Sequence, residues 1–155
     1  MSEGYVIRQC APTLAGIKTG SLFPCRCSSS RELLSEIRRL NRQLVPKGLI
    51  LLPVRYQRDQ ALLYLYRPDR LRRDLENDLA AQLLAQAGYS CSKSEQCVVR
   101  LIRRLKENED FPHEIGLFLS YPPEDVKGFI DNRACNFKCA GLWKVYGDEA
   151  AARET

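Results

Sequence analysis

Residues 111–132 read FPHEIGLFLSYPPEDVKGFIDN and carry the most informative pattern in the chain. Residues 115–119 form a short, nearly continuous apolar run, which is typical of a buried strand. The two prolines that follow favour a first helical turn, where the N–H that proline lacks would have no partner anyway. An apolar stripe at helical spacing then runs through residues 126–130. The stretch predicts a strand, a tight turn and a helix, with His113 and Glu114 at the start of the strand.

The composition is that of a folded chain. The 155 residues are 45% hydrophobic and 28% charged, enough for one domain with a sizeable core. No apolar run approaches the length that spans a bilayer, and the first ten residues lack the pattern of an export signal. These features predict a cytoplasmic protein without a membrane segment, folded as a single domain over residues 1–155.

The clearest strands cover residues 49–56 and 61–66, which are rich in aliphatic and aromatic side chains and form a predicted hairpin. Pro53 indicates that the first of them is an edge strand or is bulged. Shorter strands are expected at residues 5–7 and 142–146. With the strand predicted above, these elements indicate an α+β fold, a mixed β-sheet packed with helices.

Capping boxes and apolar stripes predict the helices. Ser29 with Glu32, and Ser92 with Glu95, each form a capping box in front of an amphipathic stretch. Leucines at intervals of four predict one bent helix or two short ones over residues 68–87.

The two ends of the chain give weaker patterns. Residues 12–20 predict one or two helical turns, between a proline suited to a first turn and a glycine suited to a stop, with a loop through residues 21–30. The sequence KTGS at residues 18–21 lacks the glycine spacing of a phosphate-binding loop. Residues 148–155 predict a C-terminal helix that is truncated soon after it begins.

Four segments together resemble a known family: residues 10–23 (CAPTLAGIKTGSLF), 62–68 (LLYLYRP), 111–132 and 141–148 (GLWKVYGD). They are similar to the bacterial domain-of-unknown-function family 3793, common in clostridia and other anaerobic Firmicutes. The resemblance implies an intracellular bacterial protein of α+β type and carries no activity. It also implies a shortened C-terminal part, because members of the family usually continue with a full helix and a further segment.

His113, the only histidine, is the candidate for enzymatic chemistry. An imidazole titrates near neutral pH and can act as a general acid or base. Glu114 would point to the opposite face of an extended strand, and Cys10 is the natural thiol partner if the fold brings the two together. The alternative is that His113 caps the end of an element by hydrogen bonds.

A metal or redox function is a second possibility, because the chain has seven cysteines. Four thiolates from two close pairs could hold zinc or an iron–sulfur cluster. The pairs are spaced by one and by three residues, where two is common, so separately buried thiols are the alternative. The four candidates are Cys25, Cys27, Cys135 and Cys139, whereas Cys91 and Cys97 are expected to pack in the core.

An anion-binding pocket is the third candidate site. Cationic side chains near the ends of sheet elements favour phosphate or carboxylate ligands. The alternative is that Arg67 and Lys144 form surface ion pairs with Asp69 and Asp148. The predicted pocket residues are Lys18, Thr19, Arg67, His113, Lys144 and Tyr146.

The charged and aromatic residues bear on whether the chain binds nucleic acid or a flat ring. The net charge is +5, with arginines clustered in residues 38–42, 67–73 and 100–104. Carboxylates are interspersed, which is typical of the solvent faces of helices and argues against nucleic acid. Aromatic side chains could stack a base or a flavin, although such residues more often line a core. The aromatic set is Tyr64, Tyr66, Tyr121, Trp143 and Tyr146.

The sequence therefore favours a cytoplasmic domain that binds a small anionic ligand or a partner. A redox or metal-linked protein that uses the cysteine pairs, and a small enzyme with His113 as acid or base, are the alternatives.

Overall fold

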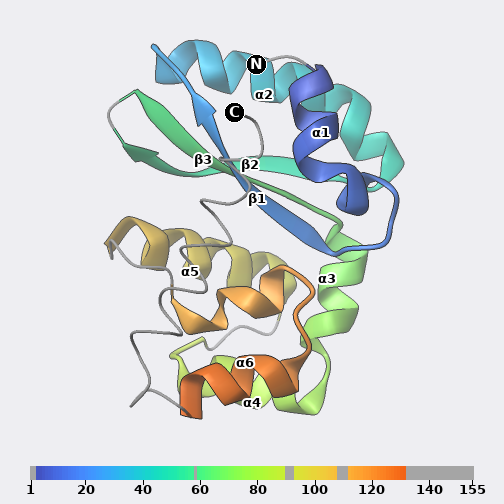
Figure 1. The fold of residues 1–155 in the computed structure, drawn as a ribbon, viewed down its shortest axis with the longest axis vertical. Helices are drawn as coiled ribbons and strands as arrows, with labels where there is room; N and C mark the ends of the chain where they lie inside the picture. Colours follow the sequence, from blue (N-terminus) through green and yellow to red (C-terminus); the bar gives the residue numbers. More distant parts are fainter. Residues whose placement is uncertain (1–2, 58, 90–92, 108–111, 132–155) are drawn as a thin grey trace.

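The computed structural model describes residues 3–57, 59–89, 93–107 and 112–131. It confirms the α+β class (Figure 1). In chain order the elements are α1 (Glu3–Leu14), β1 (Gly20–Arg26), α2 (Ser30–Leu44), η1 (Val45–Lys47), β2 (Ile50–Gln57), β3 (Gln60–Tyr66), α3 (Pro68–Leu75), α4 (Asp78–Gln86), α5 (Ser94–Glu107), η2 (His113–Phe118) and α6 (Pro123–Asp131). The predicted strand at 142–146 and the C-terminal helix lie outside the described residues.

The described strands form an antiparallel sheet in the order β1-β3-β2. The predicted hairpin is confirmed as β2 and β3. Pro53 lies in β2, at an edge of this sheet, and the register shifts between Pro53 and Arg55. The proline thus marks both an edge strand and a bulge, because neither position requires its missing N–H.

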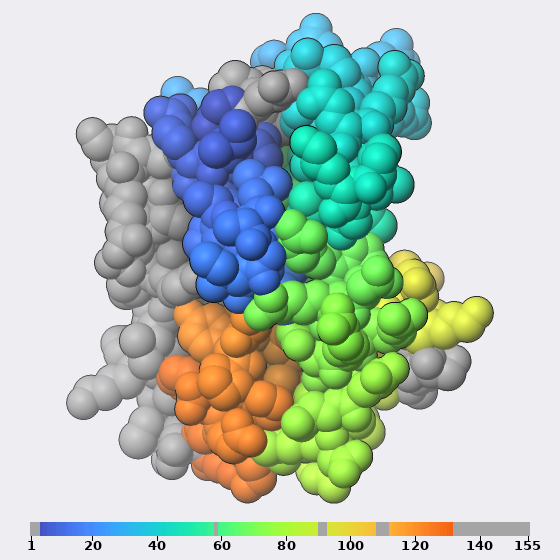
Figure 2. Space-filling view, turned by 90° about the vertical axis from the view of Figure 1, so that its right-hand side faces the viewer, coloured from blue at the N-terminus to red at the C-terminus, as the bar shows by residue number. Residues whose placement is uncertain are grey.

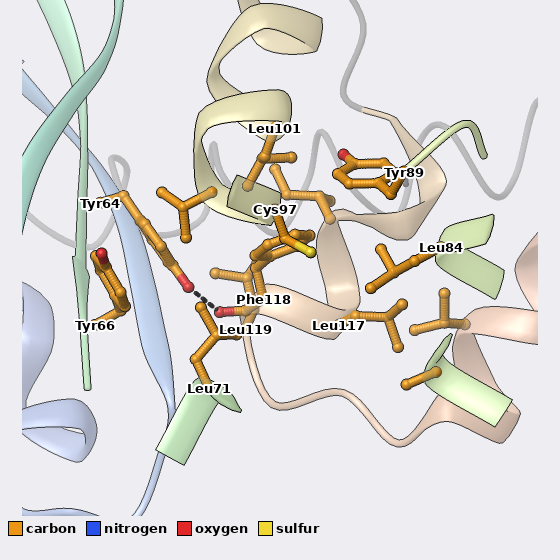
Figure 3. Close-up of a cluster of buried hydrophobic side chains, with 14 of the residues drawn as sticks. Tyr64, Tyr66, Leu71, Leu84, Tyr89, Cys97, Leu101, Leu117, Phe118 and Leu119 are labelled. Carbon is orange, nitrogen blue, oxygen red and sulfur yellow. Dashed lines mark hydrogen bonds between the residues drawn. The ribbon is translucent and has the colours of Figure 1, made fainter. Parts of the chain in front are cut away.

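Helices cover both faces of the sheet, and α3 lies at one end of it (Figure 1). Successive side chains of a strand point to opposite faces. Accordingly, Leu63 and Leu65 of β3 join one hydrophobic cluster with α1 and α2. Tyr64 and Tyr66 join a second cluster with α3, α4, α5, η2 and α6, part of which Figure 3 shows. The central strand is therefore buried from both sides.

Most predicted helices are confirmed. Ser29 caps α2, since its hydroxyl accepts a 3.3 Å hydrogen bond from the Glu32 N–H. The leucine-rich stretch divides into two short helices, α3 and α4, because Asn77 opens the second by accepting from Ala80 N at 3.1 Å. The amphipathic helix α5 is confirmed, whereas Ser92, its predicted cap, lies outside the described residues.

The strand predicted over residues 115–119 is wrong. The segment forms the 3-10 helix η2, followed by a turn in which Leu119 N and Tyr121 N both donate to Gly116 O at 3.0 Å. Residues 114–119 are all buried. The apolar residues at 115–119 therefore follow neither the two-residue period of a strand nor the 3.6-residue period of a helix. A short apolar run of this kind cannot be assigned to a strand or a helix by periodicity.

The strand predicted over residues 5–7 is wrong, because these residues belong to α1. The helix is kinked at Cys10, whose φ of −122° and ψ of 18° are not helical, and the part after the kink contains Pro12. The helical turn predicted from Pro12 is therefore present, but it ends at Leu14 and not at Gly20. The buried face of α1 holds Val6, Cys10 and Thr13. A thiol and a hydroxyl interrupt the apolar stripe by which an amphipathic helix is recognised.

The loop predicted over residues 21–30 is wrong for residues 21–26, which belong to the strand β1. Arg67 N donates to Thr19 O and Cys27 N donates to Asp59 O, so odd-numbered residues of this strand bond to β3. Pro24 is an even-numbered residue, so its backbone nitrogen points away from β3. The proline therefore costs the sheet no hydrogen bond, although it suggested a loop.

Candidate functional site

Three of the segments that carry the family resemblance meet where β1 begins and β3 ends. Gly20, the first residue of β1, lies opposite Tyr66. Thr19 N donates a 2.5 Å hydrogen bond to Ser120 Oγ, and the Thr19 hydroxyl donates to Asp74. The chain entering β1 is thus bonded both to the segment after η2 and to α3.

A close backbone approach underlies this junction. The Tyr64 hydroxyl donates a 2.6 Å hydrogen bond to Phe118 O (Figure 3). A Cβ at Gly20 would lie 2.6 Å from Phe118 O and 2.6 Å from Tyr64 Cε1. These distances are shorter than van der Waals contact, so the junction requires glycine at this position.

Arg67 caps the C-terminal end of α1. Its Nε donates to Thr13 O at 2.8 Å and its Nη2 donates to Leu14 O at 2.7 Å. The last carbonyls of a helix have no partner within the helix, and a cation there also interacts favourably with the helix dipole. Arg67 thus binds two of the last carbonyls of α1, and Thr13 O also accepts from Gly16 N at 3.1 Å.

Arg70 extends the same arrangement into the turn that follows. Its Nη2 donates to Ile17 O at 2.9 Å and its Nη1 donates to Gly16 O. Two arginines of one segment therefore hold four carbonyls of another. We call residues 13–19 the braced loop.

A buried hydroxyl pair lies at the base of the braced loop. Thr13 Oγ1 and Ser21 Oγ are 2.7 Å apart, and both side chains are buried. Cys10 is also buried and forms a hydrogen bond with Ser21. The polar groups that α1 and β1 bury against each other thus satisfy one another.

A second arginine site lies on the other face of the sheet. Arg104 Nε is 2.6 Å from Glu114 Oε1, and Arg104 Nη1 donates to Ala87 O, at the end of α4, at 3.3 Å. The Tyr89 hydroxyl donates to the same Glu114 oxygen at 3.3 Å. Burial and the charge of Glu114 raise the pKa of Tyr89. Glu114, only 3% exposed, is therefore neutralised by an ion pair.

His113 and Cys10 belong to elements on opposite faces of the sheet. His113 begins η2, which contributes to one cluster, and Cys10 belongs to the other. The Nδ1 of His113 is buried and has no hydrogen-bond partner among the described residues. Burial raises the pKa of Cys10 to about 12, against the lowering effects of Ser21 and Lys18. Such a thiol is protonated at neutral pH, whereas the thiolate is the nucleophile.

The predicted cysteine site is only partly described. Cys25 is buried at the end of β1, and Cys27 follows it, half-buried. Burial raises the pKa of Cys25. Within residues 3–131, gaps excepted, no three His, Cys, Asp or Glu side chains are grouped to hold a metal ion. Cys135, Cys139 and Cys91 lie outside the described residues, and Cys97 is buried in the core as expected.

The structure brings together three of the residues predicted for an anion pocket. Lys18 and Thr19 belong to the braced loop, and Arg67 holds it. The side chains of Thr19 and Arg67 already donate to protein acceptors. His113 lies in η2, while Lys144 and Tyr146 lie outside the described residues.

Sequence reasoning missed Arg70, Asp74 and Ser120 as members of this junction. The first two belong to a charged helix that resembles any solvated surface, so the sequence carried no signal for them. Ser120 has a positive φ of 74°, which is uncommon outside glycine, but no sequence pattern marks it.

The aromatic set is divided. Tyr64 and Tyr66 are buried and stack on each other with ring centroids 4.7 Å apart (Figure 3). This contact belongs to the core and leaves neither ring open to a ligand. Tyr121 is half-buried at the rim of the same cluster. Trp143, like Tyr146, lies outside the described residues.

These features define an α+β protein in which helices enclose an antiparallel sheet and a braced loop closes one end of β1. The family model described as "Protein of unknown function (DUF3793)" matches residues 6–155, so the chain belongs to this family. This match confirms the resemblance inferred from the sequence. No curated protein and no solved structure matches the chain. Among the described residues, none of the helices has the length and apolar character to cross a membrane.

Proposed function

We propose that this chain is a binding domain for an acidic partner, and that the braced loop and the adjoining α3 form its binding surface. Charge supports the proposal: Lys18 and the segment 67–75 together hold five cationic and two acidic residues. On the face in Figure 2, the blue N-terminal segment borders the green segment that contains β3 and α3. A cationic surface of this kind attracts and orients acidic groups.

The single observation that carries the proposal is the bracing of the loop by Arg67 and Arg70. Four carbonyls of the loop are held in place by side chains that start more than 50 residues away. A loop that is ordered before binding loses less conformational entropy when it binds. The geometry thus favours recognition by a preformed surface.

The other two functions have less support. Catalysis by His113 with Cys10 would require groups on opposite faces of the sheet to meet. The cysteine-based metal or redox function stays a prediction, because two of its four ligands lie outside the described residues. Residence in a bacterial cytoplasm belongs to the same proposal and is supported by the family resemblance described above.

The proposal is tested by titrating the isotope-labelled protein with a hexaglutamate peptide and following backbone amide shifts by NMR. We expect shifts at residues 16–18 and 67–73 that weaken as salt is added, because exposed charges are screened. Replacing Lys18 and Arg73 by Glu should remove these shifts, because it reverses two of the five positive charges of this surface. The matched control carries Arg38→Glu and Arg39→Glu on α2, and shifts that follow this control instead would contradict the proposal.

A further inference from the structure

Ile17 lies at the tip of the braced loop and is 71% exposed, the most of any large apolar side chain among the described residues. The next, Ile7, is 56% exposed. A single exposed apolar side chain is common on protein surfaces and needs no explanation by itself. The surroundings of Ile17 distinguish it from the others.

The backbone on both sides of Ile17 makes several hydrogen bonds. Ile17 N and Lys18 N both donate to Pro12 O, at 2.9 and 3.1 Å. Gly16 N donates to Thr13 O at 3.1 Å. The carbonyls of residues 16 and 17 accept from Arg70. The loop therefore holds Ile17 in solvent in a fixed position, and such anchors bind at low entropic cost.

The two arginines place fixed positive charge beside Ile17. The Nε and Nη2 of Arg67 and both terminal nitrogens of Arg70 donate to carbonyls of the braced loop. These bonds use two of the five N–H groups of each guanidinium and hold its charge next to the loop. Fixed positive charge around an exposed apolar side chain suits long-range attraction to an acidic rim.

We infer that the partner is a protein, and that Ile17 inserts into an apolar pocket whose rim carries carboxylates. The inference rests on the proposed function and names the class of partner. Buried apolar anchors at the centre of an interface, with charges at its rim, supply most of the affinity of such complexes. Lys18 and Arg70 lie where a rim of opposite charge would meet them.

The experiment places a photo-crosslinking residue at position 17 of the full chain, in the cells that naturally make the protein. The control places it at position 99, since Val99 is 52% exposed on α5. The crosslinked protein is then produced and its affinity measured by calorimetry. We expect an acidic partner captured at position 17 only, with binding weakened about tenfold or more by Ile17→Ala and unchanged by Val99→Ala.

Three outcomes would overturn the inference: crosslinks within the same chain, crosslinks to a second copy of it, or a partner whose affinity ignores Ile17→Ala. Circular dichroism of Ile17→Ala checks the fold, which an exposed truncation should leave intact. The hexaglutamate titration separates the two proposals. If the Lys18 replacement removes the hexaglutamate shifts while Ile17→Ala leaves the affinity for the captured partner unchanged, the binding surface stands. A small anion then replaces the protein partner as its ligand. If the titration shows no loop-dependent shifts, the binding surface itself is wrong.

Discussion

The hydroxyl of Tyr64 donates its hydrogen bond to the carbonyl of Phe118, which lies 54 residues further along the chain. Both residues are fully buried, and burial raises the pKa of Tyr64 well above its ordinary value. The bond joins the central strand to η2 at the point where Gly20 passes. The junction between three distant segments thus depends on one hydroxyl and one missing side chain.

Gly20→Ala should destabilise the fold. The new Cβ would press on Phe118 O and on the Tyr64 ring, and neither group can move without weakening their hydrogen bond. We expect a loss of about 2 kcal/mol or more in the free energy of unfolding, measured with urea. Gly128→Ala in α6 is the matched control, since its Cβ would have no neighbour within 4 Å. It should gain up to about 1 kcal/mol, and equal effects at the two sites would refute the close approach.

Arg104→Met should cost about 3 kcal/mol, because it leaves the buried Glu114 carboxylate without its counter-charge. Chemical denaturation measures the loss. Replacing both residues, as Arg104→Met with Glu114→Leu, should recover much of it. Lys127→Met removes the exposed pair with Asp131 and should cost less than about 1 kcal/mol. If the single and double replacements at Arg104 are equally unstable, the ion pair does not explain the effect.

Stability should fall as the pH rises above 9, in part because of Cys10. Burial raises the pKa of this thiol from 9.0 to about 12, so the folded state keeps a proton that the unfolded state loses between these values. One such group lowers the free energy of unfolding by about 1.4 kcal/mol per pH unit within that window. Cys10→Ala should remove this part of the slope, measured by urea unfolding from pH 8 to 11. Val6→Ala, on the same buried face of α1, should lower stability without changing the slope.

Asn41→Ala should weaken the outer edge of the sheet. The Asn41 amide donates to Leu51 O at 2.9 Å and accepts from Leu51 N at 2.8 Å. A side chain of α2 thus takes the place that a neighbouring strand would occupy. We expect a loss of about 1–2 kcal/mol and more self-association, because unpaired edges recruit other strands. Light scattering at high concentration measures the association, and Gln43→Ala on the same helix should leave both properties unchanged.

The sequence could predict those elements whose signal is local. The stripe of Leu33, Ile37 and Leu40, and the cap at Ser29, determine α2 within fifteen residues. The continuous aliphatic and aromatic content of β2 and β3 and the short turn between them predict the hairpin, and Pro53 marks its edge. In α2 the spacing of apolar side chains along the chain already encodes which face will be buried.

Only the tertiary structure decided the remaining elements and the site. Residues 115–119 are buried on every side, so their pattern cannot distinguish a 3-10 helix from a strand. β1 is a strand because β3 supplies its hydrogen bonds, which no residue within it reveals. Sequence reasoning placed Lys18, Thr19 and Arg67 in one site, but not Arg70 or the two hydrogen-bond partners of Thr19. The bracing of the loop joins donors and acceptors more than 50 residues apart, and hydrogen bonds over such separations leave no local pattern.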